Sequence, residues 1–214
     1  MTTFAVAGEA SKSHPAERGT VRITVSATGA DRKRVRADSI AAHAALTTEA
    51  AAHQAAGAVT EWTADRVSTA TTYEPGDAGH AVGYRASASA TVVFSDLAAL
   101  ADWISDLGGR AGIDIEGITW SLSEPVHSRL MREVRIEAIL DAIARANDYA
   151  AALDRGSPSL DAVYEDGLRP HVGGGSGFAR GAMAMRVASL DAGSYVLKPG
   201  DIEVVAAISA DFSL

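Results

Sequence analysis

The sequence contains no cysteine among its 214 residues. This absence excludes disulfides, thiolate nucleophiles and zinc sites that are built on cysteine. Aromatic residues make up only 6% of the chain, so small and branched aliphatic side chains must form most of the core. No apolar run reaches the roughly 18 residues of a membrane-spanning helix, and the first residues carry neither a basic nor an apolar segment. We therefore expect no membrane partner and a cytoplasmic location.

The charge and composition are those of an ordinary globular protein. The formal net charge of −8 favours solubility. It also argues against a nucleic acid as the partner, because the protein and the phosphate backbone are both negatively charged. Apolar residues make up 47% of the chain and charged residues 21%. No proline- or serine-rich linker divides the sequence, and the glycine-rich loop around Gly173 is the only candidate boundary. We expect residues 1–214 to form a single domain.

Alternating apolar and polar residues predict the strands, and spacings of three and four predict the helices. The predicted strands are 4–7, 21–28, 67–73, 82–92, 118–122, 160–165 and 202–214. The predicted helices are 31–54, 97–107 and a long third helix that begins near Pro125 and ends before Gly156. We expect polar residues 11–19 to separate the first two strands and residues 74–79 to form a loop.

Two of the three predicted buried helix faces depend on alanine. In the first helix the expected buried residues are Ala37, Ile40, Ala44, Thr47, Ala51 and Ala55. In the second they are Leu97, Leu100, Ile104 and Leu107, after a cap at Ser95 or Asp96. In the third they are Leu130, Val134, Ala138, Ile139, Ile143, Ala146, Ala150 and Leu153.

The order of elements up to Leu122 is β-α-β-β-α-β, the split pattern of ferredoxin-like sheets. We predict an α+β fold with a mixed, mainly antiparallel sheet of at least five strands, a third long helix and a C-terminal strand. The polar second faces of the strands indicate that the helices pack mainly on one face. Every second residue from Ile202 to Leu214 is apolar, so this strand must pair within the sheet or with a neighbouring subunit.

Three patterns that resemble functional sites are better explained by ordinary structure. The loop 167–181 lacks the lysine of a phosphate-binding loop, and Arg180 breaks the spacing of a dinucleotide-binding loop, so we interpret it as a surface loop. The six histidines are scattered, and His43 and His53 lie ten residues apart on one predicted helix. Asp161, Glu165 and Asp166 are typical of a charged turn. We therefore predict no catalytic residue, no cofactor, no metal and no enzymatic activity.

The predicted first helix begins with four basic residues, Arg32, Lys33, Arg34 and Arg36. Cations at a helix N-terminus oppose its macrodipole, so the sequence breaks a local rule here. Two interpretations stay open: a solvated face, or an interaction patch for an acidic protein partner. The three tryptophans, Trp62, Trp103 and Trp120, are interpreted as packing residues.

Several short motifs, in order, resemble the SIMPL-domain family. They are Val6-Ala-Gly8-Glu9, Gly83-Tyr84-Arg85-Ala86, Ile115-Glu-Gly-Ile-Thr-Trp120, the helix around Ala142–Ala150, and Lys198-Pro-Gly-Asp-Ile-Glu. The resemblance implies a mostly bacterial family without an established enzymatic activity, with stress-related or scaffolding roles and a tendency to self-assemble. Many relatives carry an export signal that is missing from this N-terminus, so the resemblance does not transfer a periplasmic role.

Two functions are left open by the sequence. The first is a non-enzymatic, self-associating protein that forms homo-oligomers. The alternative is a module that binds a small ligand with the hairpin of strands 67–73 and 82–92 and the glycine-rich loop.

Overall fold

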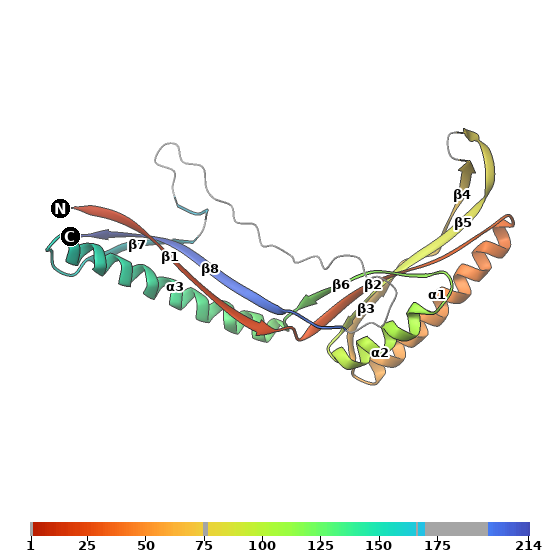
Figure 1. Ribbon diagram of the computed structural model, residues 1–214, viewed down its shortest axis with the longest axis horizontal. Helices are drawn as coiled ribbons and strands as arrows, with labels where there is room; N and C mark the ends of the chain where they lie inside the picture. The colour runs from red at the N-terminus through yellow and green to blue at the C-terminus, as the bar shows by residue number, and fades with distance from the viewer. Residues whose placement is uncertain (1, 75–76, 166, 170–196) are drawn as a thin grey trace. The chain divides into compact units, whose positions relative to one another are not determined.

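The computed structural model describes residues 2–74, 77–165, 167–169 and 197–214 (Figure 1). Its described residues form three helices and two antiparallel sheets, in two compact units. Unit 1 contains the described residues within 1–15, 122–185 and 201–214, and unit 2 contains those within 16–121 and 186–200. The glycine-rich loop predicted at 167–181 lies outside the described residues beyond Arg169. That residues 1–214 act as one domain stays a prediction.

Unit 2 has the predicted split β-α-β-β-α-β arrangement. Its strands are β2 (Arg18–Gly29), β3 (Val59–Ala64), β4 (Ser68–Glu74), β5 (Asp77–Phe94) and β6 (Ile113–Ser121). Their order is β3-β5-β2-β6, and all pairs are antiparallel. β4 also pairs with β5, at residues 77–87, whereas β3 pairs with residues 90–94. β3 and β4 therefore share the position of one edge strand. β3 is absent from the sequence prediction because only Val59 in it is buried.

Two helices, α1 (Arg32–Ala55) and α2 (Leu97–Gly108), pack on one face of this sheet. The core is built from alternate residues of β2 and β5 and one side of each helix: Val21, Ile23, Val25, Val92, Phe94, Leu46, Leu100, Trp103, Ile104 and Leu107. α2 follows the prediction closely, because its apolar residues are large and fall on one side. Asp96 is its N-cap, with Oδ1 accepting from the backbone N–H groups of Ala98 and Ala99.

The predicted buried face of α1 is wrong. Its buried residues are Val35, Ser39, Leu46 and Ala50, whereas the side chain of Ile40 is 44% exposed. Alanine occurs on every side of this helix, so spacing alone did not separate one side from another. The few larger side chains decide the packing, because Val35 and Leu46 bury more apolar area than any alanine.

Unit 1 is a three-stranded sheet with one long helix. Its strands are β1 (Thr3–Pro15), β7 (Ser159–Glu165) and β8 (Asp201–Ser213), in the antiparallel order β1-β8-β7. The helix α3 (Glu124–Ala152) lies along β1 and β8 (Figure 1). The buried residues of α3 recur at every fourth position: Leu130, Val134, Ala138, Ala142, Ala146 and Ala150. Such a row is inclined to the helix axis and so follows the twist of the strands below it.

The sequence left two partners open for the C-terminal strand: the sheet of its own chain or a neighbouring subunit. In the structure it pairs within its own chain. β8 is the central strand of unit 1, and Val204, Ala206, Ile208, Ala210 and Phe212 are buried beneath α3. The α+β class, the antiparallel pairing and the helices on one face are confirmed. The strands form two sheets instead of one, because β1 pairs with β8 from the other end of the chain, whereas β2 pairs with β5 and β6.

The prediction that polar residues 11–19 separate the first two strands is wrong. Only residues 16 and 17 lie between β1 and β2. Backbone pairing does not depend on apolar side chains, and the ladder of β1 continues to Pro15 opposite Asp201. The polar side chain of Lys12 is held within unit 1, because its Nζ lies 2.8 Å from carboxylate oxygens of both Glu133 and Glu137 on α3.

Candidate functional site

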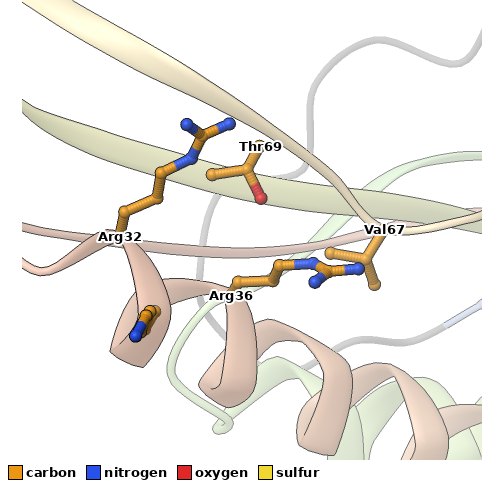
Figure 2. Close-up of a pocket in the computed structure, with 5 residues that line it drawn as sticks. Arg32, Arg36, Val67 and Thr69 are labelled. Carbon is orange, nitrogen blue, oxygen red and sulfur yellow. The ribbon is translucent and has the colours of Figure 1, made fainter.

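The basic residues at the start of α1 line a cavity in unit 2. The cavity has a volume of about 340 Å³ and is formed by Arg32, Lys33 and Arg36 from α1 together with Val67 and Thr69. Figure 2 shows Arg32 extending from the first turn toward Thr69, and Arg36 extending toward Val67. Sequence reasoning identified the cations but missed the opposite wall, because Val67 and Thr69 lie about thirty residues farther along the chain.

The start of α1 is fixed by Asp31, which precedes it. The Oδ1 atom of Asp31 accepts hydrogen bonds from the backbone N–H groups of Lys33 at 2.8 Å and Arg34 at 3.3 Å. This cap sets the register, so that residues 32, 33 and 36 reach the cavity wall. Arg34 does not line the cavity: its side chain is 82% exposed and its Nε lies 3.9 Å from Asp38. The structure therefore divides the four predicted patch residues into three cavity residues and one outside it.

The three cavity cations have no carboxylate partner among the residues that the structure describes. In the described part of the chain, no ion pair joins Arg32, Lys33 or Arg36 to an acidic side chain, whereas Arg34 has Asp38. The guanidinium of Arg32 lies 5.9 Å from the centroid of the Tyr84 ring, a cation–π contact that holds it near β5. No acidic residue lies in the first turn of α1. The cavity thus gathers three positive charges that form no ion pair with a described acidic side chain.

Buried polar atoms without a hydrogen-bond partner occur on the same elements. Within the described residues they are the Oγ of Ser39, the Nε2 of His43 and the Oγ1 of Thr69. Ser39 and His43 follow Arg36 on α1, and Thr69 belongs to β4 on the cavity wall. Buried polar atoms in folded proteins are nearly always hydrogen-bonded, so each of these atoms is expected to have a partner such as water or a ligand.

Three other residues singled out by the sequence, Asp161, Glu165 and His53, have structural partners. Asp161 accepts a hydrogen bond from the Oγ of Ser213 at 3.0 Å, and Glu165 lies 3.5 Å from the Nε of Arg135. Asp166 lies outside the described residues. His53 packs edge-on against Phe94. No group of three His, Asp or Glu side chains in the described ranges could hold a metal ion. The absence of catalysis, cofactor and metal stays a prediction.

The tryptophans are packing residues, as predicted. Trp103 is buried, and its Nε1–H donates to Oε2 of Glu49 at 2.9 Å, while Arg110 binds the other carboxylate oxygen. Burial acts most strongly on the pKa of Glu49 and raises it, but the hydrogen bonds from Arg110 and Trp103 together lower it below the ordinary value. Trp62 and Trp120 lie partly buried against the same core. The Glu49 carboxylate therefore ties α1 to α2.

A second exposed feature, missed by the sequence reasoning, lies on α3. Ile136 and Leu140 are 55% and 58% exposed. Each is two residues from members of the buried row, which places it about 200° around the helix from them. Ile139 and Ile143, which the sequence predicted as buried, are only partly buried at the border of the core, and Leu153 is exposed. The signal was present in the sequence as the spacing 136, 139, 140 and 143.

The fold and the two surfaces define an α+β protein that combines a ferredoxin-like unit with a helix packed on a three-stranded sheet. Residues 4–212 match the family model SIMPL, described as a protein of unknown function (DUF541). The chain therefore belongs to the SIMPL family, as its motifs indicated. A comparison with curated proteins found no match. None of the helices in the described ranges is long and apolar enough to cross a membrane.

Proposed function

We propose that the protein is a non-enzymatic, self-associating member of the SIMPL family that serves a scaffolding or stress-related role. The observation that carries this proposal is the exposed apolar side of α3 at Ile136 and Leu140. Large exposed apolar side chains are concentrated in unit 1, which has eight of the eleven in the described residues. The eight are Ile136, Leu140, Tyr149, Leu153, Leu160, Val163, Leu168 and Val205; the three in unit 2 are Ile40, Tyr73 and Val82.

The unit 1 sheet also has an open edge, at β7. The edge strand β7 carries the exposed Leu160 and Val163, and the ion pair of Arg135 with Glu165 holds α3 next to it. We call Ile136, Leu140, Leu160 and Val163 the unit 1 apolar surface. Grouped exposed apolar residues mark interaction sites more often than isolated ones do, and Ile136 and Leu140 are neighbours one turn apart on α3, which supports a partner at this side of the helix.

A second copy of the chain is the partner that fits the edge of β7. An unpaired strand is a template for another strand, and two identical antiparallel edges can pair about a twofold axis. The opposite edge strand, β1, is less available, because the backbone N–H of Glu9 donates to Oδ2 of Asp141 at 3.0 Å. No strand in the described part of the chain pairs with the outer edge of β7. Self-pairing of β7 would bring Leu160 and Val163 of one copy beside those of the other and so reduce their exposure.

Light-scattering mass across a dilution series tests this proposal. The wild type should be oligomeric, and the double variant Ile136→Glu/Leu140→Lys should have the mass of one chain, because it places charges on the apolar surface without changing the net charge. The matched control is Ile40→Glu/Val82→Lys, which changes two exposed apolar residues of unit 2 and should keep the wild-type mass. A monomeric wild type, or equal loss of mass in both variants, would contradict the proposal.

We infer a second candidate function, the binding of a small ligand where the hairpin of β4 and β5 meets α1. The cavity of about 340 Å³ favours it, because this volume lies within the usual range of small-molecule sites. Thermal stabilisation of the protein in a screen of metabolites, with loss of that effect in Arg36→Gln, would support this function. A screen without any stabilising compound would count against it.

A further inference from the structure

We infer that the cavity of Arg32, Lys33, Arg36, Val67 and Thr69 takes a small organic anion carrying a phosphate or several carboxylates. This inference rests on the ligand-binding function proposed above and names the chemical class of the ligand. Its starting point is the pattern of ion pairs around the first turn of α1. The three cations that line the cavity have no acidic partner in the described residues, whereas Arg34, which lies outside it, is next to Asp38.

Three positive charges in the first turns of α1 exceed the single negative charge of the Asp31 cap, and this excess is unfavourable for the free protein. Cations near a helix N-terminus oppose the macrodipole, and the three like charges also repel one another. An anion in the cavity would relieve both effects. Two arginines and a lysine supply three positive charges, which suits a ligand with at least two negative charges, and guanidinium groups match the geometry of phosphate and carboxylate oxygens.

The ligand would be bound by side chains and not by the helix terminus itself. Asp31 already accepts hydrogen bonds from the backbone N–H groups of Lys33 and Arg34, so these groups are not free for an anion. The hydroxyl of Thr69 provides an independent indication of a ligand. Its Oγ1 is buried and has no hydrogen-bond partner among the described residues, and Figure 2 shows it on the cavity wall between the arginine side chains. A rotation about the Cα–Cβ bond of Thr69 would turn that hydroxyl into the cavity, where it could donate to an oxyanion held by Arg32 and Arg36.

The cavity also limits what else the ligand can be. Val67 is the only apolar side chain among the described residues of the lining, which disfavours a large hydrophobic ligand. The volume of about 340 Å³ exceeds what a bare phosphate ion needs, so we expect a few carbon atoms beside the charged group. An acidic protein segment is the other occupant that such charges could attract, and the experiment separates it from a small molecule.

The test is a titration of the isotope-labelled full chain followed by amide NMR signals of residues 32–36, 67 and 69. The probes are glycerol 3-phosphate, citrate, a tetraglutamate peptide, and glycerol as the neutral match of the first probe. Glycerol 3-phosphate or citrate should shift these signals in a saturable manner, and glycerol should not. Whichever of the two anions binds more tightly distinguishes phosphate from carboxylate recognition.

Two variants that each remove one positive charge distinguish a specific anion site from general electrostatic attraction of the anion to the helix. Arg36→Gln removes a cavity cation and should weaken anion binding about fivefold. Arg34→Gln removes the same charge from the same turn of α1, but outside the cavity lining, and should leave binding within about a factor of two. Thr69→Val, which keeps the shape of the side chain, should also weaken binding, because it removes the hydroxyl donor.

Three results would overturn the inference. Equal weakening by Arg34→Gln and Arg36→Gln would show a general charge effect without a site. Saturable binding of glycerol but not of the anions would refute the anionic class and leave the ligand-binding function standing, whereas no shift with any probe would refute both. Binding of tetraglutamate alone would assign the cavity to an acidic protein segment.

Discussion

Gly8 of β1 lies so close to α3 that a Cβ atom on it would be 2.8 Å from the Cβ of Ala142. The same added atom would lie 2.0 Å from the carbonyl oxygen of Ala138. Glycine in the strand and alanine in the helix therefore determine how closely α3 approaches the sheet of unit 1. The alanine-rich inner side of α3 allows this approach, whereas its larger residues Ile136 and Leu140 are left on the outer side.

Replacing Gly8 with alanine should destabilise the protein. The added methyl group meets backbone and not a flexible side chain, so α3 must move, and overpacking of this kind costs about 1–3 kcal/mol. The measurement is the free energy of unfolding in urea. Gly109→Ala is the control, because an added Cβ at Gly109 meets nothing within 4 Å. A loss of stability in the control as large as that of Gly8→Ala would contradict this explanation.

Acidic pH should weaken the contact between β1 and α3. The hydrogen bond from the backbone N–H of Glu9, followed by that from Arg145, lowers the pKa of Asp141 below its ordinary value of 3.8, although burial acts against this. A carboxyl group with a lowered pKa in the folded state stabilises the protein above its unfolded pKa. That contribution disappears as the pH falls through the folded pKa.

Asp141→Asn should therefore lower the free energy of unfolding at neutral pH, and its difference from wild type should shrink as the pH falls below about 4. The control is Asp148→Asn, an exposed residue on the same helix. Urea unfolding at a series of pH values measures both. A deficit that stays constant across the acidic range would show that the charge of Asp141 does not contribute.

Deleting residues 202–214 should abolish the folding of unit 1, because β8 is the partner of both β1 and β7. If residues 1–214 act as one domain, as the sequence predicts, the core of unit 2 should unfold with it. Amide NMR signals and circular dichroism of the truncated chain report on each unit. Retention of the unit 2 signals would show two independently folding units, and retention of unit 1 would show that β8 is not needed.

The corrected buried face of α1 predicts opposite outcomes for two aliphatic residues of that helix. Leu46→Ala should cost about 2–5 kcal/mol, because Leu46 is 1% exposed and its removal leaves a cavity in the core of unit 2. Ile40→Ala should change stability by less than about 0.5 kcal/mol. Thermal and urea unfolding of the two variants measure the difference. Similar losses of stability in both variants would show that Ile40 is buried, as the sequence predicted.

Regular alternation of large apolar residues made several elements predictable from the sequence. β8 and residues 86–94 of β5 have such alternation. α2 has its leucines and isoleucine on one side. The same reasoning failed where alanine or polar residues dominate. In α1 it chose the side of Ile40, because alanines made the sides alike. In β1 it ended the strand at Ala7, although the strand continues to Pro15 and the charge of Lys12 is balanced by α3.

The candidate sites were predictable only in part, because each depends on contacts between distant segments. The cations of the cavity were recognisable from the rule they break at a helix start. Thr69 was not, because an isolated threonine in an edge strand carries no such signal. The outer side of α3 was misassigned because Ile139 and Ile143 are larger than Ala138 and Ala142. Spacing does not reveal that Gly8 requires alanine on the buried side.

The most direct test of self-association through α3 is a distance between subunits measured with spin labels. Because the chain has no cysteine, Asn147→Cys gives one label per chain, two turns beyond Leu140 on the outer side of α3. Ala51→Cys labels the exposed side of α1 as a comparison. We predict a dipolar coupling at residue 147, at a shorter distance than at residue 51, that disappears in Ile136→Glu/Leu140→Lys. No coupling at residue 147, or a coupling that persists in the double variant, would contradict self-association through this face.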